Sequence, residues 1–246
     1  MLPVGRSFTD LPIFLEVAAN KTDTSDHIRI IMEKSKVNQD QKSGSPTAES
    51  HLRLRITATS GAVFLNMLSA GFSVIANAGC SINEFLSQGW EISEAYINDR
   101  IQTIFLNGKA VDDSKSATLQ EGATLALSAA MPGMVGSTLR KGGVFAGMRS
   151  QISHVTNPLA HQDRQIRVRL KLFNLIAKEL GPAFLQKGVY LEGAKFLGFL
   201  QSSSEELKAV SLLISLNDVQ TDVAGLLEMN WENMDVFLQV TVEPES

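Results

Sequence analysis

A glycine-rich segment has the residue types best suited to binding a ligand. Residues 129–143 read Ala-Ala-Met-Pro-Gly-Met-Val-Gly-Ser-Thr-Leu-Arg-Lys-Gly-Gly. Successive backbone amides in such a segment can form a concave nest for an anion, and neighbouring basic side chains add positive charge. The same composition is also typical of a packed turn where two backbones approach closely. Both interpretations stay open, and the candidate ligand-binding residues are Gly133, Gly136, Ser137, Thr138, Arg140, Lys141, Gly142 and Gly143.

The other reactive residue types form no recognisable catalytic or metal-binding pattern. Cys80 precedes an expected helix, whose dipole can lower a thiol pKa, but no histidine is near it in sequence and a buried structural thiol is favoured. His154 and His161 share a connector in a spacing that fits no standard metal site. Neither a Gly-x-Ser-x-Gly elbow nor a His-Glu-x-x-His helix occurs. We therefore assign no catalytic residue, metal or cofactor, and favour a binding protein over an enzyme.

Basic residues alternate with apolar ones in two segments that resemble half-buried strands. Arg53 and Arg55 alternate with leucine and isoleucine near residue 54, and Arg167, Arg169 and Lys171 do so near residue 168. Such a basic face either meets an acidic partner or protects a strand surface in solvent. The sequence does not decide between the two.

Composition indicates an ordinary globular protein. The chain has 246 residues, 44% hydrophobic and 20% charged, which suits one large domain or two domains of about 100 residues each. Its net charge of −4 gives no basic field to attract nucleic acid or acidic membranes. A single cysteine, and an N-terminus without a basic segment followed by an apolar run, predict the cytoplasm. We expect a protein partner or self-association, with a small anion as an alternative ligand.

Linker composition divides the chain into three parts. Residues 1–50 form a lead segment and a polar linker, the linker being the turn-rich residues 37–50. Residues 51–153 form a first module, and residues 154–246 form a second small α+β module. The expected fold class is therefore α+β.

The first module is expected to combine strands with a capped helix. Strands are predicted over 52–57, 72–76, 101–106, 123–127 and 144–152. Ser81 and Glu84 have capping-box spacing, so a helix should begin at Ser81. Asn107-Gly108 predicts a type I′ hairpin turn, because both residues tolerate positive φ.

The second module repeats the rhythm of basic-faced strand, helix and apolar strand with an asparagine turn. A strand over 166–172 precedes a helix over 174–187, which Pro182 should interrupt or kink. Further strands are predicted over 189–191, 196–200, 210–216 and 236–242, with a turn at Asn217-Asp218. The shared rhythm suggests a structural duplication.

Three short motifs of the first module carry a resemblance to a known family. They are residues 80–86 (Cys-Ser-Ile-Asn-Glu-Phe-Leu), 104–111 (Ile-Phe-Leu-Asn-Gly-Lys-Ala-Val) and 118–125 (Thr-Leu-Gln-Glu-Gly-Ala-Thr-Leu). Together they resemble the ubiquitin-like β-grasp proteins, and most closely the small sulfur carriers of molybdopterin and thiamine synthesis. The resemblance implies a small sheet clasping a helix and a habit of docking on partner proteins.

Sulfur carriage needs a free C-terminal Gly-Gly, whose carboxylate becomes a thiocarboxylate. Gly142-Gly143 lies in a similar place, yet the sequence continues to Ser246, so this chemistry would require cleavage after Gly143. We therefore expect a non-catalytic interaction module that engages its partner through a β-grasp surface and residues 129–143. The alternatives are a sulfur-carrier-like protein processed after Gly143, or an enzyme with an anionic-substrate site at that segment.

Overall fold

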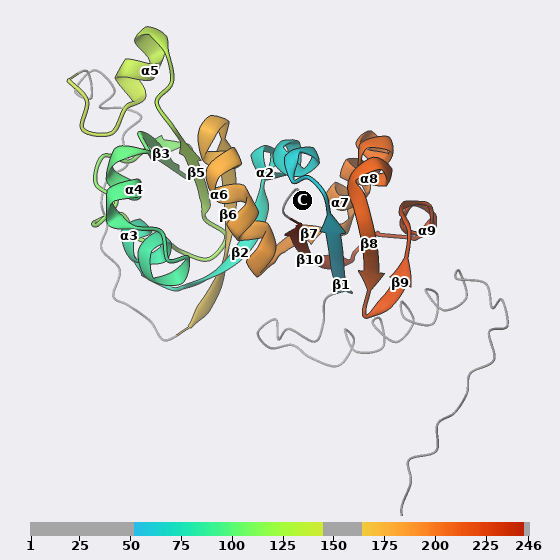
Figure 1. Cartoon of the computed structure of the whole chain (residues 1–246). Coiled ribbons are helices and arrows are strands. Elements are labelled where there is room, and N and C mark those ends of the chain that lie inside the picture. The colour runs from blue at the N-terminus through green and yellow to red at the C-terminus, as the bar shows by residue number, and fades with distance from the viewer. Residues whose placement is uncertain (1–51, 145–163, 244–246) are drawn as a thin grey trace, which may run out of the picture.

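A mixed sheet of ten strands, with helices packed beside it, forms the body of the protein (Figure 1). The computed structural model describes residues 52–144 and 164–243. Its strands are β1 (Leu52–Ala58), β2 (Phe72–Asn77), β3 (Thr103–Leu106), β4 (Lys109–Ala110), β5 (Thr124–Ser128), β6 (Gln165–Phe173), β7 (Val189–Glu192), β8 (Ser211–Leu216), β9 (Val219–Thr221) and β10 (Asp235–Val242).

Helical segments connect most of the strands, in line with the expected α+β class. They are the 3-10 turn η2 (Ala62–Phe64), α2 (Leu65–Ala70), α3 (Ile82–Glu84), the π-helical η3 (Phe85–Gly89), α4 (Glu94–Asp99), α5 (Gly133–Leu139), α6 (Asn174–Lys187), α7 (Gly193–Ser202), α8 (Ser204–Val210) and α9 (Val223–Glu228). None of the helices within the described ranges is long and apolar enough to cross a bilayer.

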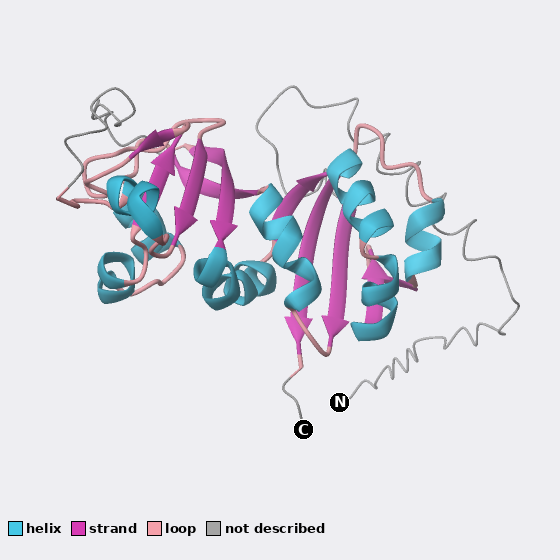
Figure 2. Cartoon of the chain, turned by 90° about the horizontal axis from the view of Figure 1, so that it is seen from above, coloured by secondary structure: helices cyan, strands magenta, loops and turns pink. Residues whose placement is uncertain are grey.

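The sheet consists of two groups of five strands that meet near its middle (Figure 2). Its order is β4-β3-β5-β6-β2-β7-β10-β1-β8-β9. We call the first five strands half-sheet A and the last five half-sheet B. Ser73 on β2 and Tyr190 on β7 form the antiparallel pair that joins them.

The two half-sheets have the same pairing pattern when each is followed inward from its outer edge. In half-sheet A an antiparallel hairpin, β4–β3, leads to antiparallel β3–β5, parallel β5–β6 and antiparallel β6–β2. In half-sheet B the hairpin β9–β8 leads to antiparallel β8–β1, parallel β1–β10 and antiparallel β10–β7. Each half-sheet therefore has a parallel pair between antiparallel neighbours.

Each half-sheet includes one strand that is distant in sequence from its other strands. β1 begins the described chain, but it lies in half-sheet B between β10 and β8. β6 follows residue 154, but it lies in half-sheet A between β5 and β2. In half-sheet A, four strands precede residue 129 and β6 follows residue 164. In half-sheet B, four strands follow residue 164 and β1 precedes residue 129.

Apolar residues on one face of the central strands supply the core. In β1, Leu54 and Ile56 are buried while Arg53 and Arg55 are exposed, as the alternation predicted. In β6 the buried residues are Ile166, Val168, Leu170 and Leu172, each 2% exposed or less. This alternation is the main reason that the strands were recognisable from sequence.

The two asparagine turns have matching geometry. Asn107 and Gly108 have φ of 51° and 77°, and Asn217 and Asp218 have φ of 47° and 67°. These values suit the predicted type I′ turn, and β3 pairs with β4 directly across the first turn. The predicted hairpin at Asn107 is therefore confirmed.

Each asparagine also forms two hydrogen bonds with one residue of a neighbouring strand, and we call this pair of bonds an asparagine clasp. Thr124 N donates to Asn107 Oδ1 at 2.8 Å, and Asn107 N donates to Thr124 O at 2.8 Å. Arg53 N donates to Asn217 Oδ1 at 2.7 Å, and Asn217 N donates to Arg53 O at 2.8 Å. Thr124 begins β5 and Arg53 lies near the start of β1, the strands that occupy the same place in the two half-sheets.

A glycine with positive φ also joins helix to strand at the same place in each half-sheet. Gly71 joins α2 to β2 with φ 111° and ψ 140°, and Gly188 joins α6 to β7 with φ 103° and ψ 142°. A Cβ at Gly188 would lie 2.2 Å from the ring of Phe237, so a larger residue would have to displace that ring.

The structure confirms the capping box and corrects one element. Ser81 Oγ accepts from Glu84 N at 3.1 Å, and Ser81 N donates to Glu84 Oε2 at 2.8 Å. The predicted strand over 196–200 is wrong, because this stretch lies inside α7. Phe196, Phe199 and Leu200 are buried at the i, i+3, i+4 spacing of a helix face, a period that the short apolar run concealed.

Two further predictions concern helices. α6 covers the predicted 174–187, and Pro182 lies within it rather than ending it. Residues 129–143 were expected to be a loop, but they contain α5. The lead segment, the linker and the strand expected over 144–152, apart from Val144, lie outside the described residues.

Candidate functional site

The candidate site is the segment around α5, which extends beyond the end of β5 and away from half-sheet B (Figure 1). Gly133 begins α5, while Gly136, Ser137 and Thr138 lie within it. Arg140, Lys141, Gly142 and Gly143 follow the helix directly. All eight predicted site residues therefore lie on one short stretch, and its central part is helical.

The inner side of α5 packs tightly on the chain that leads into it. A Cβ at Gly136 would lie 1.9 Å from the carbonyl oxygen of Met131, so only glycine allows this approach. The hydroxyls of Ser137 and Thr138 each donate to a carbonyl one turn earlier, Gly133 O and Met134 O, at 2.9 Å. The two hydroxyls thus have partners within the helix.

Lys141 fixes the end of α5 to the body of half-sheet A. Its backbone N donates to Gln102 O at 2.8 Å, and its Nζ donates to Ile97 O within α4. Burial lowers the pKa of Lys141, and Asp99 partly opposes that shift. A half-buried ammonium bonded to a carbonyl acts here as a structural anchor.

The amides of the Gly-Gly pair also have partners in the protein. Gly142 N donates to Asp112 Oδ1 at 2.8 Å, and Gly143 N donates to Arg140 O at 3.2 Å. The Asp112 carboxylate therefore already accepts a hydrogen bond from a backbone amide that an anion-binding nest would need for its ligand. An external anion at this position would have to displace Asp112.

The outer side of the segment presents apolar side chains to solvent. Met134 is 86% exposed, Val135 is 70% exposed and Val144 is 96% exposed. Phe173 and Leu175 are also partly exposed, and Phe173 pairs with Ser128 where β5 leads into the segment. Apolar surface thus gathers at the end of half-sheet A that carries α5.

A cavity of about 230 Å³ lies beside the last residues of β2, which include Asn77. It is lined by Ile75, Ala76, Asn77, Cys80, Glu84, Phe85, Gln88, Gly89 and Gln165. Burial raises the pKa of the Cys80 thiol, with a smaller rise from the Glu84 charge, so the thiol stays protonated at neutral pH. Glu84 Oε2 accepts the capping hydrogen bond, and these contacts fit a structural helix start.

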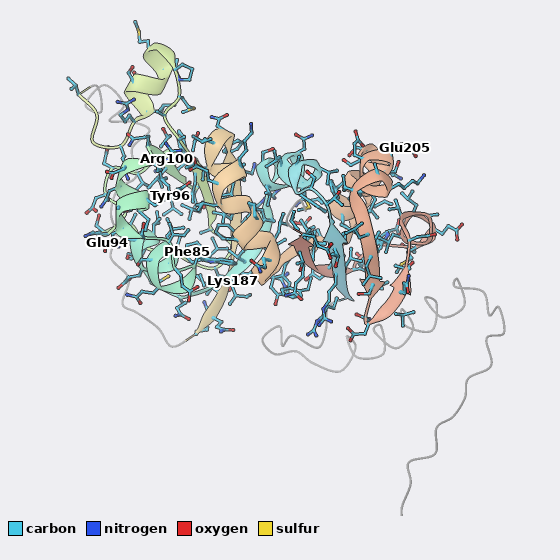
Figure 3. All side chains as sticks on the ribbon, viewed as in Figure 1. Phe85, Glu94, Tyr96, Arg100, Lys187 and Glu205 are labelled. Carbon is cyan, nitrogen blue, oxygen red and sulfur yellow. The ribbon has the colours of Figure 1, made fainter. Side chains whose placement is uncertain are left out.

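A second polar cluster connects α4 to α6. Tyr96 Oη donates to Glu179 Oε2 at 2.6 Å, and Arg100 forms an ion pair with the same carboxylate. Figure 3 labels Tyr96 and Arg100 between the two helices. Hydrogen bonds from Arg100 and Tyr96 hold the pKa of Glu179 below its usual value, and burial and Glu179 raise that of Tyr96. The cluster stabilises helix packing and lines no described cavity.

Three arginines of the basic strand faces bind carboxylate or carbonyl groups of the same chain. Arg55 pairs with Asp218 at 2.9 Å, and Arg167 pairs with Asp235 at 2.6 Å. Arg169 donates to Ala70 O at 3.1 Å. These contacts give the two basic faces a structural role.

Within residues 52–144 and 164–243, no group of three or more His, Cys, Asp or Glu could hold a metal ion. His154 and His161 fall outside the described residues. No family model, curated protein or solved structure matches the chain.

Sequence reasoning located the segment but missed the residues that define its surface. Met134 and Val135 lie among the glycines of this segment, and nothing in the sequence shows that their side chains are exposed. In the sequence, the pair Asp112-Asp113 after the Asn107 hairpin is typical of a solvated turn. Only the fold reveals that Asp112 accepts from Gly142.

Proposed function

We propose that this protein is a non-catalytic protein-binding module whose contact surface is the α5 segment. The observation that carries the proposal is the exposure of Met134, Val135 and Val144 on a segment whose inner side is fixed. Exposed apolar side chains that cluster on one element are typical of protein contact sites. The partner is a protein with an apolar surface that receives these side chains.

The anchoring of the segment supports this role. Gly136 packs on Met131, and Lys141 and Gly142 are bonded to Gln102 and Asp112. An apolar surface held in one conformation loses less conformational freedom on binding, which favours affinity. Two alternatives remain, an anionic-substrate site and a processed sulfur carrier, and the Asp112 contact counts against the first. The first would need the Asp112 contact broken, and the second would need cleavage after Gly143.

We also propose that the two half-sheets are β-grasp-like units related by duplication. Each half-sheet has a parallel central pair, as a β-grasp sheet does, and helical segments follow its inner-edge strand, α3 to α4 after β2 and α7 to α8 after β7. The matched turns at Asn107 and Asn217, and the matched glycines at 71 and 188, support common ancestry of the two units. On this proposal each unit takes one central strand from the other part of the chain, β6 in half-sheet A and β1 in half-sheet B, with β6 in the place of β10 and β1 in the place of β5.

Site-directed photo-crosslinking in the native host tests the binding role. A photoreactive amino acid at Val135 should trap a defined protein adduct. The matched control is the same amino acid at Glu205 on α8, whose side chain is 82% exposed on half-sheet B. The substitution Met134→Ser should reduce the adduct at position 135 without changing the unfolding curve. Identical adducts at both positions would contradict the proposal.

Intact-mass measurement on the native protein separates the alternatives. A uniform full-length chain is expected from a binding module. A fragment that ends at Gly143 would instead favour the sulfur-carrier alternative.

A further inference from the structure

We infer that a second copy of this chain can complete the half-sheets in trans, giving a strand-exchanged dimer. The interface contains the strand pairs that β1 and β6 form with their neighbours, together with the β2–β7 pair. This inference rests on strand pairing alone and is independent of the α5 contact surface.

Two segments of the chain supply the strands that complete one another. The segment before residue 129 contains β1 to β5, and the segment after residue 164 contains β6 to β10. β6 pairs with β2 from Phe72↔Leu170 to Asn77↔Gln165, and with β5 from Thr124↔Arg169 to Ser128↔Phe173. β1 pairs with β10 from Leu52↔Val236 to Ala58↔Val242, and it also pairs with β8. Each segment therefore provides a central strand to the half-sheet built by the other.

A missing central strand would leave each half-sheet open at its middle. Without β6, both β2 and β5 would have unpaired backbone groups, and the core would lose the buried face of Ile166, Val168, Leu170 and Leu172. If β1 were missing, its two neighbours, β10 and β8, would likewise have unpaired backbone groups. An unpaired strand edge next to an apolar core is a template for another strand of suitable sequence. A second copy carries that sequence.

The outer edges of the sheet are less suited to the same role. β4 spans Lys109–Ala110 and β9 spans Val219–Thr221. Short edge strands are a common protection against strand addition from outside. Pairing between copies is therefore expected at the central gaps.

The covalent connection between the two segments favours half-sheets completed within one chain over half-sheets completed between two chains. Residues 129–164 join β5 to β6 in one chain, so the two segments meet at an effective concentration of roughly millimolar. Folding at far lower protein concentration then closes both half-sheets within one chain. Folding at concentrations that approach this value allows β6 and β1 to be exchanged between two chains.

A cleavable version of the full chain tests the interface directly. A protease site is inserted between residues 153 and 154, and the folded protein is cleaved. The two pieces should stay together in gel filtration, separate in denaturant and reassemble when refolded together. Each piece refolded alone should lack the cooperative unfolding of the complex. Pieces that separate after cleavage, or that fold cooperatively alone, would overturn the inference.

Two differently tagged full-length copies then test exchange between chains. The copies are unfolded together and refolded at low and at high concentration. Dimers with both tags are expected to increase with concentration during folding and to persist on dilution, and simple mixing of folded copies should form none. Monomers at every concentration would overturn the inference. Dimers that form on mixing and vanish with Met134→Ser would indicate contact through α5 instead.

Discussion

Arg167 on β6 lies over the ring of Tyr190 on β7, with its guanidinium carbon 4.7 Å from the ring centroid. The same guanidinium bonds Asp235 on β10 at 2.6 Å, and the Tyr190 ring contacts Phe237. β6 belongs to half-sheet A, whereas β7 and β10 belong to half-sheet B. This cluster therefore connects the two half-sheets beside the Ser73–Tyr190 pair.

Removing the guanidinium should weaken the whole fold. Arg167→Ala is expected to lower the free energy of unfolding by about 1–3 kcal/mol, because Asp235 keeps a partly buried charge without its cation. A double-mutant cycle with Tyr190→Leu should give a coupling of about 0.5–1 kcal/mol for the cation–π contact. Chemical denaturation measures both. Arg55→Ala is the control, because its exposed pair with Asp218 should contribute about 0–1 kcal/mol.

The asparagine clasps predict parallel behaviour in the two half-sheets. Asn107→Gly keeps the positive φ but loses the bond from Thr124 N, so it should cost about 0.5–1.5 kcal/mol of unfolding free energy. Asn107→Ala should cost about 1–2 kcal/mol more, because alanine is strained at that φ. Asn217→Gly and Asn217→Ala should follow the same order. A glycine variant as stable as the original protein at either position would contradict the proposed role of the clasp.

Local signals made much of the fold predictable from sequence. The Ser81 capping box, the Asn107 turn and the alternation in β1 and β6 depend on residues close in the chain, so they could be read directly. The partners of β1 and β6 could not be read, because a strand's alternation shows which face is buried and not which strand lies beside it. The placement of β1 and β6 in the half-sheets thus depends on long-range pairing that no local pattern encodes.

In the candidate site, too, local features could be predicted from sequence and long-range contacts could not. The concentration of glycines at 133, 136, 142 and 143 located the segment, since close backbone approach needs glycine. The bond from Gly142 N to Asp112 joins residues 30 positions apart, and spacing in the sequence gives no sign of it. The exposure of Met134 and Val135 was equally hidden, because it depends on where the rest of the chain packs.

The Tyr96–Arg100–Glu179 cluster predicts sensitivity to acid. Because the folded pKa of Glu179 lies below its unfolded value, its contribution to stability is present above about pH 4.3 and is lost as pH falls further. Glu179→Gln should therefore flatten the fall in denaturation midpoint between neutral and acidic pH. The control Glu205→Gln, at an 82% exposed side chain, should leave the slope nearly unchanged. An unchanged acid slope in Glu179→Gln would show that other carboxylates govern it.

Two glycine-to-alanine substitutions inside helices should have opposite effects. Gly198 on α7 is exposed with open space around it, so Gly198→Ala should raise the free energy of unfolding by about 0.5–1 kcal/mol. At Gly136 the added methyl would meet Met131 O at 1.9 Å, so α5 must shift or open. Because α5 lies outside the sheet, hydrogen exchange is the more direct readout: amides of residues 134–143 should exchange about 5-fold faster or more in Gly136→Ala. Unchanged protection there would mean that the contact with Met131 does not hold the proposed binding surface in place.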